Sequence, residues 1–371
     1  MPKDRVTAHT PKNSGGFGRA SGTMPPRLLT EFELIRHLRR MRPIPSGPLS
    51  SILTGIGDDA AIVQPRRGHV LLASTDVLAE QVHFDVAYMT YRQVGYRAAV
   101  ANLSDMAAMG ATPRYALVAV ALHPKTAVRD VKSLFTGVWE ACSMAQTVVI
   151  GGDTSASRGS LFVCLTILGE AKEKQVLKRS GAGKGDVLYV TGTLGDSRAG
   201  WEILRHRKAG QPLRRDRNTR YLLKRHIRPT ARLVESRKLA GSGVASSAID
   251  LSDGLAGDLR HICEESSVGA VLDVRRLPVS RSLVSYAHAE RKDPLDYALL
   301  GGEDYELLFT VPVKKVSQVE ALIHRGQLCA TRIGRMTAPR EGLRIITADG
   351  KTGPLRVRGY EHHIGMSGCR P

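Results

Sequence analysis

Residues Gly55–Val63 read GIGDDAAIV, and they place two adjacent carboxylates between a glycine turn and a short apolar run. The apolar run Ala60–Val63 is typical of a strand, and a second strand is predicted at Val70–Ser74. Further strands alternate with helices along the chain, which indicates an α/β (α+β) protein whose helices pack on sheets. Asp58 and Asp59 are then either turn residues or ligands of a metal ion.

The periodicity of apolar residues predicts the remaining elements. Further strands are expected at Tyr115–Leu122, Thr147–Ile150, Leu161–Leu168, Asp186–Thr191, Ser247–Ile249, Ala270–Asp273 and Asp304–Val311. Helices are expected at Thr30–Met41, Tyr91–Met109, Val128–Ala145, Ser197–Lys208, Thr219–His226, Thr230–Leu239, Leu255–Glu265 and Val316–Arg325.

The chain is predicted to divide into a tail and two domains. Residues 1–27 are rich in Pro, Gly, Ser and Thr with scattered basic residues, so we expect them to be disordered. The polar, basic stretch Lys172–Gly185 marks the boundary between an N-terminal domain, 28–171, and a C-terminal domain, 172–371. With 371 residues, the chain is long enough to give both domains a core.

Composition excludes several classes of protein. The longest apolar run, Ala116–Leu122, is too short to cross a bilayer, and no secretory signal pattern opens the sequence. The five cysteines are scattered without a Cys-x-x-Cys pair, which argues against a disulfide framework and a cysteine-ligated zinc site. A cytoplasmic protein without a membrane partner is expected.

The net charge of +19 allows two interpretations of the arginine-rich stretch between Arg205 and Lys238. One is a solvated helical surface, and the other is a surface that binds nucleic acid. No helix-turn-helix, zinc-finger or RNP-like pattern accompanies the stretch, so we favour the solvated surface and expect no specific nucleic-acid partner.

A set of aspartates falls where predicted strands give way to turns. Its members are Asp58, Asp59, Asp76, Asp153, Asp250 and Asp253. Any one of them could cap a helix or brace a turn. In a chain with 54 Lys+Arg against 35 Asp+Glu, the repetition points instead to a shared cation site. Carboxylates select Mg²⁺ or Ca²⁺, and Mg²⁺ usually accompanies phosphate, so the set favours nucleotide chemistry.

Two common nucleotide-binding patterns do not apply. Residues 55–60 satisfy the G-x-G-x-x-A form of the dinucleotide fingerprint, but their carboxylates would repel a pyrophosphate and the segment precedes a strand. Gly183 and Lys184 hint at a P-loop, but Gly185 stands where that motif requires Ser or Thr. A nucleotide must therefore bind in another architecture.

Several motifs between residues 30 and 362 together resemble the thiamine-monophosphate kinase family of the aminoimidazole-ribonucleotide-synthetase-like superfamily. In chain order they are Gly55–Asp59, Ser74–Asp76 with His83, Asn102–Gly110, Gly151–Thr154, Arg179–Ala182, Val190–Gly192, Ala248–Leu255 and Gly301–Leu307. The combination of Leu-Ser-Asp-Gly-Leu with Gly-Gly-Glu-Asp-Tyr-Glu-Leu carries the resemblance.

The resemblance implies ATP-dependent phosphorylation of thiamine monophosphate to thiamine diphosphate, by a homodimer whose N-terminal strands close a barrel between subunits. The implied Mg²⁺ ligands are Asp59, Ser74, Thr75, Asp76, Asp105, Asp153, Asp250 and Asp253. The implied contacts to ATP are Gly152, Asp153, Arg179 and Ser252, and those to the substrate are His83, Glu303 and Tyr360. Asp58 remains a turn residue or a supporting acid.

The residues suit direct in-line transfer without a phosphoenzyme. The acceptor is an already ionised phosphate, so the reaction needs positioning and cations rather than a general base. We therefore assign no catalytic acid or base.

Ordinary roles stay open for individual residues. His83 alone would more often be a surface or core histidine, Glu303 a loop acid and Asp105 a solvent-facing acid on a helix.

Two relatives in the same superfamily fit less well. A selenophosphate-synthetase-like protein needs a reactive Cys or Sec in a Gly-rich N-terminal segment, which residues 13–22 lack. A hydrogenase-maturation-like protein ends in a functional Cys, whereas Cys369 is followed by Arg370 and Pro371.

Overall fold

A computed structural model describes residues 40–41, 51–54, 60–206 and 216–355. The expected tail, most of the helix expected at 30–41, and the site residues Asp58, Asp59 and Tyr360 lie outside these ranges.

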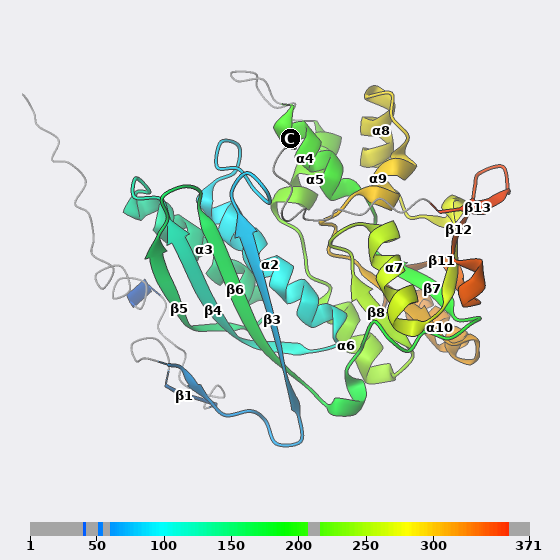
Figure 1. Ribbon diagram of the computed structural model, residues 1–371, viewed down its shortest axis with the longest axis horizontal. Helices are drawn as coiled ribbons and strands as arrows, with labels where there is room; N and C mark the ends of the chain where they lie inside the picture. Colours follow the sequence, from blue (N-terminus) through cyan, green and yellow to red (C-terminus); the bar gives the residue numbers. More distant parts are fainter. Residues whose placement is uncertain (1–39, 42–50, 55–59, 207–215, 356–371) are drawn as a thin grey trace, which may run out of the picture.

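The described residues form a four-stranded and a seven-stranded sheet with helices packed on them (Figure 1), and β1 pairs with β2 in a separate two-stranded sheet. The strands are β1 (Ile52–Thr54), β2 (Ile62–Val63), β3 (Val70–Ala79), β4 (Thr112–Leu122), β5 (Val148–Ala156), β6 (Phe162–Ala171), β7 (Val187–Thr191), β8 (Ser247–Asp250), β9 (Gly269–Asp273), β10 (Leu307–Val311), β11 (Ala330–Thr337), β12 (Leu343–Ile346) and β13 (Thr352–Pro354). The α-helices are α2 (Tyr91–Ala108), α3 (Val128–Met144), α4 (Asp196–Arg205), α5 (Arg217–Ile227), α6 (Leu233–Ser242), α7 (Leu255–Ser266), α8 (Arg281–Ala289), α9 (Pro294–Leu300) and α10 (Val316–His324).

The N-terminal sheet has the strand order β3-β6-β4-β5, and α2 and α3 cover one of its faces (Figure 1). Strand β6 is antiparallel to both β3 and β4, whereas β5 is parallel to β4. Thr90 caps α2, where its side chain accepts from the backbone of Gln93 while the Gln93 side chain accepts from the backbone of Thr90. This capping box fixes where the helix that carries Asp105 begins.

Two glycines set the close packing of α2 on α3. A Cβ atom at Gly95 would lie 2.0 Å from the carbonyl oxygen of Leu134, and one at Gly137 would lie 1.9 Å from that of Arg92. Either distance is far below van der Waals contact, so no larger residue fits at these positions. The two glycines therefore allow the backbones of α2 and α3 to approach each other closely.

The C-terminal sheet has the order β13-β12-β9-β11-β7-β10-β8, and its pairs are antiparallel except for β12 with β9. Helix α2 packs on the N-terminal sheet and also contacts α6 and β8 of this C-terminal domain. Ser236 of α6 donates to the carbonyl of Ala107, and one apolar core contains Met106 of α2 together with Ala240 and Ala248. The packing of α2 thus joins the two domains.

Within the described residues the expected strands and helices are present, but several of the expected ends are wrong, most of all at β3 and β5. Strand β3 continues through Asp76 to Ala79, and β5 continues through Asp153 to Ala156, because β6 and β4 provide paired partners along the added length. Asp250, in contrast, is the last residue of β8. The rule that ligands gather at the ends of parallel strands therefore applies poorly to these mainly antiparallel sheets.

Several elements in the last third were not predicted, namely α8, α9 and β11 to β13. Their segments are short or mix charged and apolar residues, so the periodic signal is weak. Within the described ranges, no helix combines the length and the apolar character needed to span a membrane.

The face of the N-terminal sheet that α2 and α3 leave open carries apolar side chains. Burial alternates along β3, and Leu71 and Val77 on this face are 49% and 52% exposed. Phe162 of β6 pairs with Ala79 on the same face and is 40% exposed. Exposed large apolar side chains on an open sheet face are a feature of surfaces that bind a partner.

Candidate functional site between the two domains

A cavity of about 520 Å³ lies where α2 and β3 of one domain meet β8 and residues 178–180 of the other. Ser74, Asp105, Arg179 and Asp250, all predicted site residues, line it. Folding therefore brings four of the predicted residues together around one cavity. Two of them, Ser74 and Asp250, are 176 residues apart in the sequence.

Hydrogen bonds hold the carboxylates of this cavity in place. Ser74 donates to Asp105 across the β3–α2 contact, and Ser104 donates to Asp250 at 2.7 Å. The backbone of Asp76 donates to the side chain of Asn102 at 3.1 Å. Three closely spaced residues of α2 thus each contact a different part of the site, namely Asn102, Ser104 and Asp105.

The carboxylates lie close enough to act on one another. Burial, followed by the charge of Asp105, raises the pKa of Asp76 to about 6. Burial and the charge of Asp105 likewise raise the pKa of Asp250 to about 7. Burial raises the pKa of Asp105 itself, against the hydrogen bond from Ser74 and the charge of Arg179. Such mutual repulsion is relieved when a cation enters.

Arg179 reaches the site because its segment pairs with β8. The backbone of Ala248 donates to the carbonyl of Lys178 at 2.8 Å, which places the next residue, Arg179, beside Asp250. Gly181 has φ +114°, and a Cβ there would lie 2.5 Å from the carbonyl oxygen of Ser246. Only glycine allows this close approach, which explains the glycine in the Arg-Ser-Gly motif.

A second pair of motifs is joined by backbone hydrogen bonds. Glu303 donates to the carbonyl of Ser252 at 2.8 Å, and Tyr305 donates to that of Leu251 at 2.9 Å. A Cβ at Gly302 would lie 2.4 Å from the oxygen of Ser252, so the close contact requires glycine there. The predicted residues Ser252 and Glu303 are therefore neighbours.

Tyr305 connects this loop to the cavity. Burial is the main cause that raises the pKa of Tyr305, and the charges of Glu303, Asp250 and Asp76 also act on its phenol. Asp76 and Asp250 at the cavity and Glu303 in the loop thus all lie within electrostatic reach of the buried Tyr305 phenol.

Asp253 stands at the start of α7. Its backbone donates to Asp258 at 3.2 Å. Burial, then the charges of Asp250 and Asp253, raise the pKa of Asp258 to about 8. Asp253 and Asp250 therefore both lie within the electrostatic reach of Asp258.

Thr75 and Asp153 lie on the opposite face of the sheet from the cavity. The Thr75 hydroxyl donates to the carbonyl of Leu165 at 3.0 Å. The register aligns Thr75 with Thr166 and Leu117, and Asp153 with Ala119, two residues further along β4. Side chains alternate along a strand, so Ser74 and Asp76 face α2 whereas Thr75 and Asp153 do not. The seven implied ligands that lie within the described residues therefore do not form one group.

Gly152 and His83 also lie away from the cavity lining. A Cβ at Gly152 would lie 1.9 Å from the carbonyl oxygen of Val118, so this glycine allows β5 to pack on β4. The Nδ1 atom of His83 accepts from the backbone of Ala79 at 3.0 Å in the turn after β3.

The donor set of the cavity fits a hard divalent cation. It offers carboxylate and hydroxyl oxygens, which such a cation prefers. Burial and the repulsion of neighbouring carboxylates raise the pKa values of Asp76 and Asp250, and a bound cation would relieve that repulsion. Within the described ranges, no three His, Cys, Asp or Glu side chains stand close enough to hold a metal ion by themselves. Asp59, the remaining implied ligand of the first motif, lies outside those ranges.

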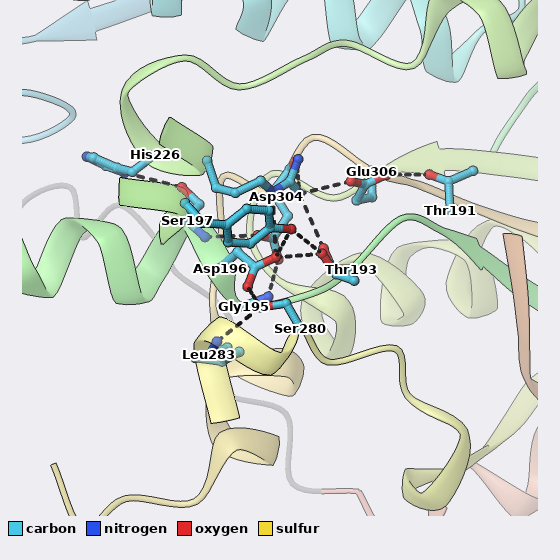
Figure 2. A network of polar contacts seen from close by, with 12 residues as sticks. Thr191, Thr193, Gly195, Asp196, Ser197, His226, Ser280, Leu283, Asp304 and Glu306 are labelled. Carbon is cyan, nitrogen blue, oxygen red and sulfur yellow. Dashed lines mark hydrogen bonds and ion pairs between the residues drawn. The ribbon is translucent and has the colours of Figure 1, made fainter. Parts of the chain in front are cut away.

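The other acids of the Gly-Gly-Glu-Asp-Tyr-Glu-Leu motif have structural roles (Figure 2). Asp304 accepts from the backbone of Gly195 at 2.6 Å and of Ser197 at 3.2 Å, at the start of α4. Glu306 is fully buried and accepts from Thr191 at 2.6 Å. The motif thus combines one partly exposed acid, Glu303, with two buried acids that anchor it.

The expectation of a solvated arginine surface is wrong for two arginines of the 205–238 stretch, Arg225 and Arg232, whose side chains are 13% and 21% exposed. Arg225 donates to Glu306 at 2.9 Å, and Arg232 donates to Glu306 at 2.6 Å through its Nε atom. Arg228 donates to Glu140 of α3 and lies 4.4 Å from the ring centre of Tyr96. Arg225 and Arg232 thus pair with a buried acid, whereas Arg228 forms an ion pair between the two domains.

Sequence reasoning missed three residues of the region, namely Arg97, Ser104 and Tyr305. Ser104 lies inside the Asn-Leu-Ser-Asp motif and could have been included with Asp105. Arg97 stands between Tyr96 and a run of Ala and Val in α2, and an arginine in an apolar stretch is itself a signal.

Comparisons with known proteins find related sequences over most of the chain. The family model "AIR synthase related protein, N-terminal domain" matches residues 57–171, and its C-terminal counterpart matches residues 183–346. The chain is 39% identical to the thiamine-monophosphate kinase of Salmonella typhimurium over 333 residues, which are 90% of this chain and 98% of that protein.

Solved structures give the same result. The complex "AaThiL complexed with AMPPCP and TMP" matches with a TM-score of 0.71 at 33% identity, over 92% of this chain and 100% of that one. The hydrogenase maturation protein HypE in complex with ATP matches with a TM-score of 0.66 over 89% of this chain and 92% of that one, at 21% identity, which shows a shared fold alone.

Proposed function

Since this chain belongs to the thiamine-monophosphate kinase family of AIR synthase-related proteins, we propose that its interdomain cavity is where phosphoryl transfer takes place. The reaction is the ATP-dependent phosphorylation of thiamine monophosphate to thiamine diphosphate, a step of thiamine diphosphate biosynthesis. The observation that carries the location is that Asp105 and Asp250, one from each domain, face one cavity together with Arg179.

The transfer is direct and in line, from ATP to the phosphate of thiamine monophosphate. That phosphate is ionised at neutral pH, so it attacks without a general base. Arg179 supplies positive charge beside the phosphates. Ser252, Gly152 and Asp153 stay proposed ATP contacts by motif position, and Gly152 and Asp153 lie away from the cavity lining. Positioning two polyanions against each other is then the main task of the chain.

Mg²⁺ is held by carboxylates of this region, and it neutralises phosphate charge when bound. Ser74, Asp76, Asp105 and Asp250 surround or adjoin the cavity and form its described donor set. Asp59, Thr75, Asp153 and Asp253 remain proposed ligands by motif position. His83, Glu303 and Tyr360 remain the proposed substrate contacts.

An assay with labelled ATP tests the reaction and its directness together. Purified protein is incubated with Mg²⁺, thiamine monophosphate and ATP labelled in the γ-phosphate. We expect the label in thiamine diphosphate and none on the protein. A lack of labelled product would refute the activity, whereas label retained on the protein would refute direct transfer.

The protein is proposed to be a homodimer in which the open face of the four-stranded sheet joins its copy in a barrel. The exposed apolar side chains of that face support this, because a lone sheet face rarely leaves such groups in water. The same face carries Thr75 and Asp153, so dimerisation would also cover these two proposed ligands.

Leu71→Lys is expected to break this dimer. The change places two lysines in an apolar interface and should weaken association about 100-fold, or ~3 kcal/mol. Light scattering coupled to size exclusion at micromolar concentration should report a dimer for the wild type and a monomer for the variant. Val313→Lys, at a C-terminal-domain residue that is 67% exposed, is the matched control and should stay dimeric. A dimeric Leu71→Lys protein would exclude this face.

The remaining features of the chain fit this proposal. The division between 28–171 and 172–371 is supported by the four-stranded and seven-stranded sheets and by the two matched ranges, whereas the disordered tail 1–27 stays a prediction. The ion pairs of Arg225, Arg228 and Arg232 support the absence of a specific nucleic-acid partner. The thiols of Cys164, Cys263 and Cys329, which form no disulfide, support a cytoplasmic location.

A further inference from the structure

A buried arginine lies behind the proposed substrate residue Glu303. Arg97 is in α2 and its side chain is only 1% exposed. A guanidinium stays charged when it is buried, so its burial is costly unless partners compensate the charge. Arg97 donates to the backbone carbonyl of His226 in α5 and to the carboxylate of Glu303.

His226 does not share the charge of this group. Burial, then the charge of Arg97, lowers the pKa of His226 well below its ordinary value, so the ring is neutral. Its Nδ1 atom lies 3.2 Å from Arg97 and 3.2 Å from the hydroxyl of Ser197, which is the position of an acceptor. The carboxylate of Glu303 therefore balances the buried guanidinium.

Glu303 is held on one side and open on the other. Its side chain is 31% exposed, although its charged partner is almost fully buried. Its backbone has φ +63°, a left-handed conformation that costs about 1 kcal/mol for a residue other than glycine. The hydrogen bond to Ser252 holds that backbone, and Arg97 holds the side chain from the other domain.

The phenol of Tyr88 lies within electrostatic reach of the pair. Burial is the main cause that raises the pKa of Tyr88, followed by the charge of Asp85, and the charges of Arg97 and Glu303 also act on its phenol. A partly exposed carboxylate held by a buried guanidinium is itself suited to bind an organic cation or an aromatic amine.

We propose that Arg97 is a positioning residue for substrate binding, which aims the Glu303 carboxylate at the cationic, amine-bearing ring system of thiamine monophosphate. This inference rests on the proposed function. In this proposal Arg97 does not contact the substrate, because its side chain is buried behind Glu303. It acts by keeping one carboxylate oxygen fixed while the exposed part of the group meets the ligand. ATP, bound at the cavity through Arg179, does not depend on this contact.

The test compares Arg97→Gln, Glu303→Gln and the double variant. Arg97→Gln should raise the KM for thiamine monophosphate about 10-fold and leave the KM for ATP within about twofold. The double variant should match Glu303→Gln alone, because Arg97 has no effect once its carboxylate is gone. Arg97→Lys keeps the charge and should recover part of the affinity. Arg228→Gln removes another ion pair between the domains and should leave both KM values unchanged.

A merely structural ion pair would give a different pattern. It would raise the KM for both substrates alike, or give effects that multiply in the double variant, and either result would overturn the positioning role. If Arg97→Gln does not fold, the same comparison is made with Arg97→Lys, alone and combined with Glu303→Gln. A wild type that forms no thiamine diphosphate refutes the function itself, which is distinct from a wild type that is active but insensitive to Arg97.

Discussion

Asp250→Asn is expected to lower kcat about 1,000-fold, or ~4 kcal/mol, while the protein stays folded. Asp250 is the carboxylate that the C-terminal domain brings to the cavity, and an amide oxygen neutralises a bound cation far less well. The amide can still accept the hydrogen bond from Ser104. Removing one of several repelling carboxylates should leave the metal-free protein at least as stable as the wild type.

The measurement is initial rates of thiamine diphosphate formation, with a thermal melt in the absence of Mg²⁺ and nucleotide. Asp273→Asn is the matched control, because Asp273 ends strand β9 of the same sheet but is paired with Arg275 at 2.8 Å, outside the cavity. We expect the control to keep full activity. Substantial activity in Asp250→Asn would mean that phosphoryl transfer takes place elsewhere.

Glu306→Gln is expected to destabilise the protein by about 3 kcal/mol, which corresponds to a fall in Tm of roughly 10 °C. Glu306 is fully buried and accepts from both Arg225 and Arg232, whose side chains are 13% and 21% exposed. The neutral amide would leave two largely buried guanidinium groups without this carboxylate. Each arginine keeps a second acid nearby, so we expect a value at the lower end for a broken buried pair.

Glu140→Gln separates this burial effect from the loss of an ion pair as such. Glu140 also has two arginine partners, Arg92 at 2.9 Å and Arg228, but its side chain is 24% exposed. Because solvent screens such pairs, the free energy of unfolding should change by less than about 1 kcal/mol. Thermal melts and urea unfolding of both variants give the comparison. Similar losses in the two variants would contradict the assigned role of burial.

Most elements of the fold could be predicted from local patterns. The apolar runs at β4, β6 and β10 and the helical periodicity of α3 and α7 are properties of neighbouring residues. The lengths of β3 and β5 were underestimated because their polar residues, Asp76 and Asp153, resemble strand ends. Pairing with β6 and β4 extends both strands, and pairing is a tertiary property.

The sequence by itself determined which chemical groups the protein has and which family it belongs to. The glycine-bounded acids, Arg179 and the Gly-Gly-Glu-Asp-Tyr-Glu-Leu motif are contiguous patterns, so they can be recognised without coordinates. The same patterns do not say which of their acids face a cavity. Glu303 is exposed, whereas Asp304 and Glu306 of the same motif are buried anchors.

The tertiary structure alone decided which of these groups meet. Ser104 and Asp250 are 146 residues apart and Arg97 and Glu303 are 206 apart, yet each pair shares a hydrogen bond. The face of β3 that carries Ser74 and Asp76 was likewise decided by register, which separates them from Thr75. The physical reason is that chain spacing governs geometry only over a few residues. Contacts between distant segments are selected by the burial of a common core, here around α2, and by strand pairing.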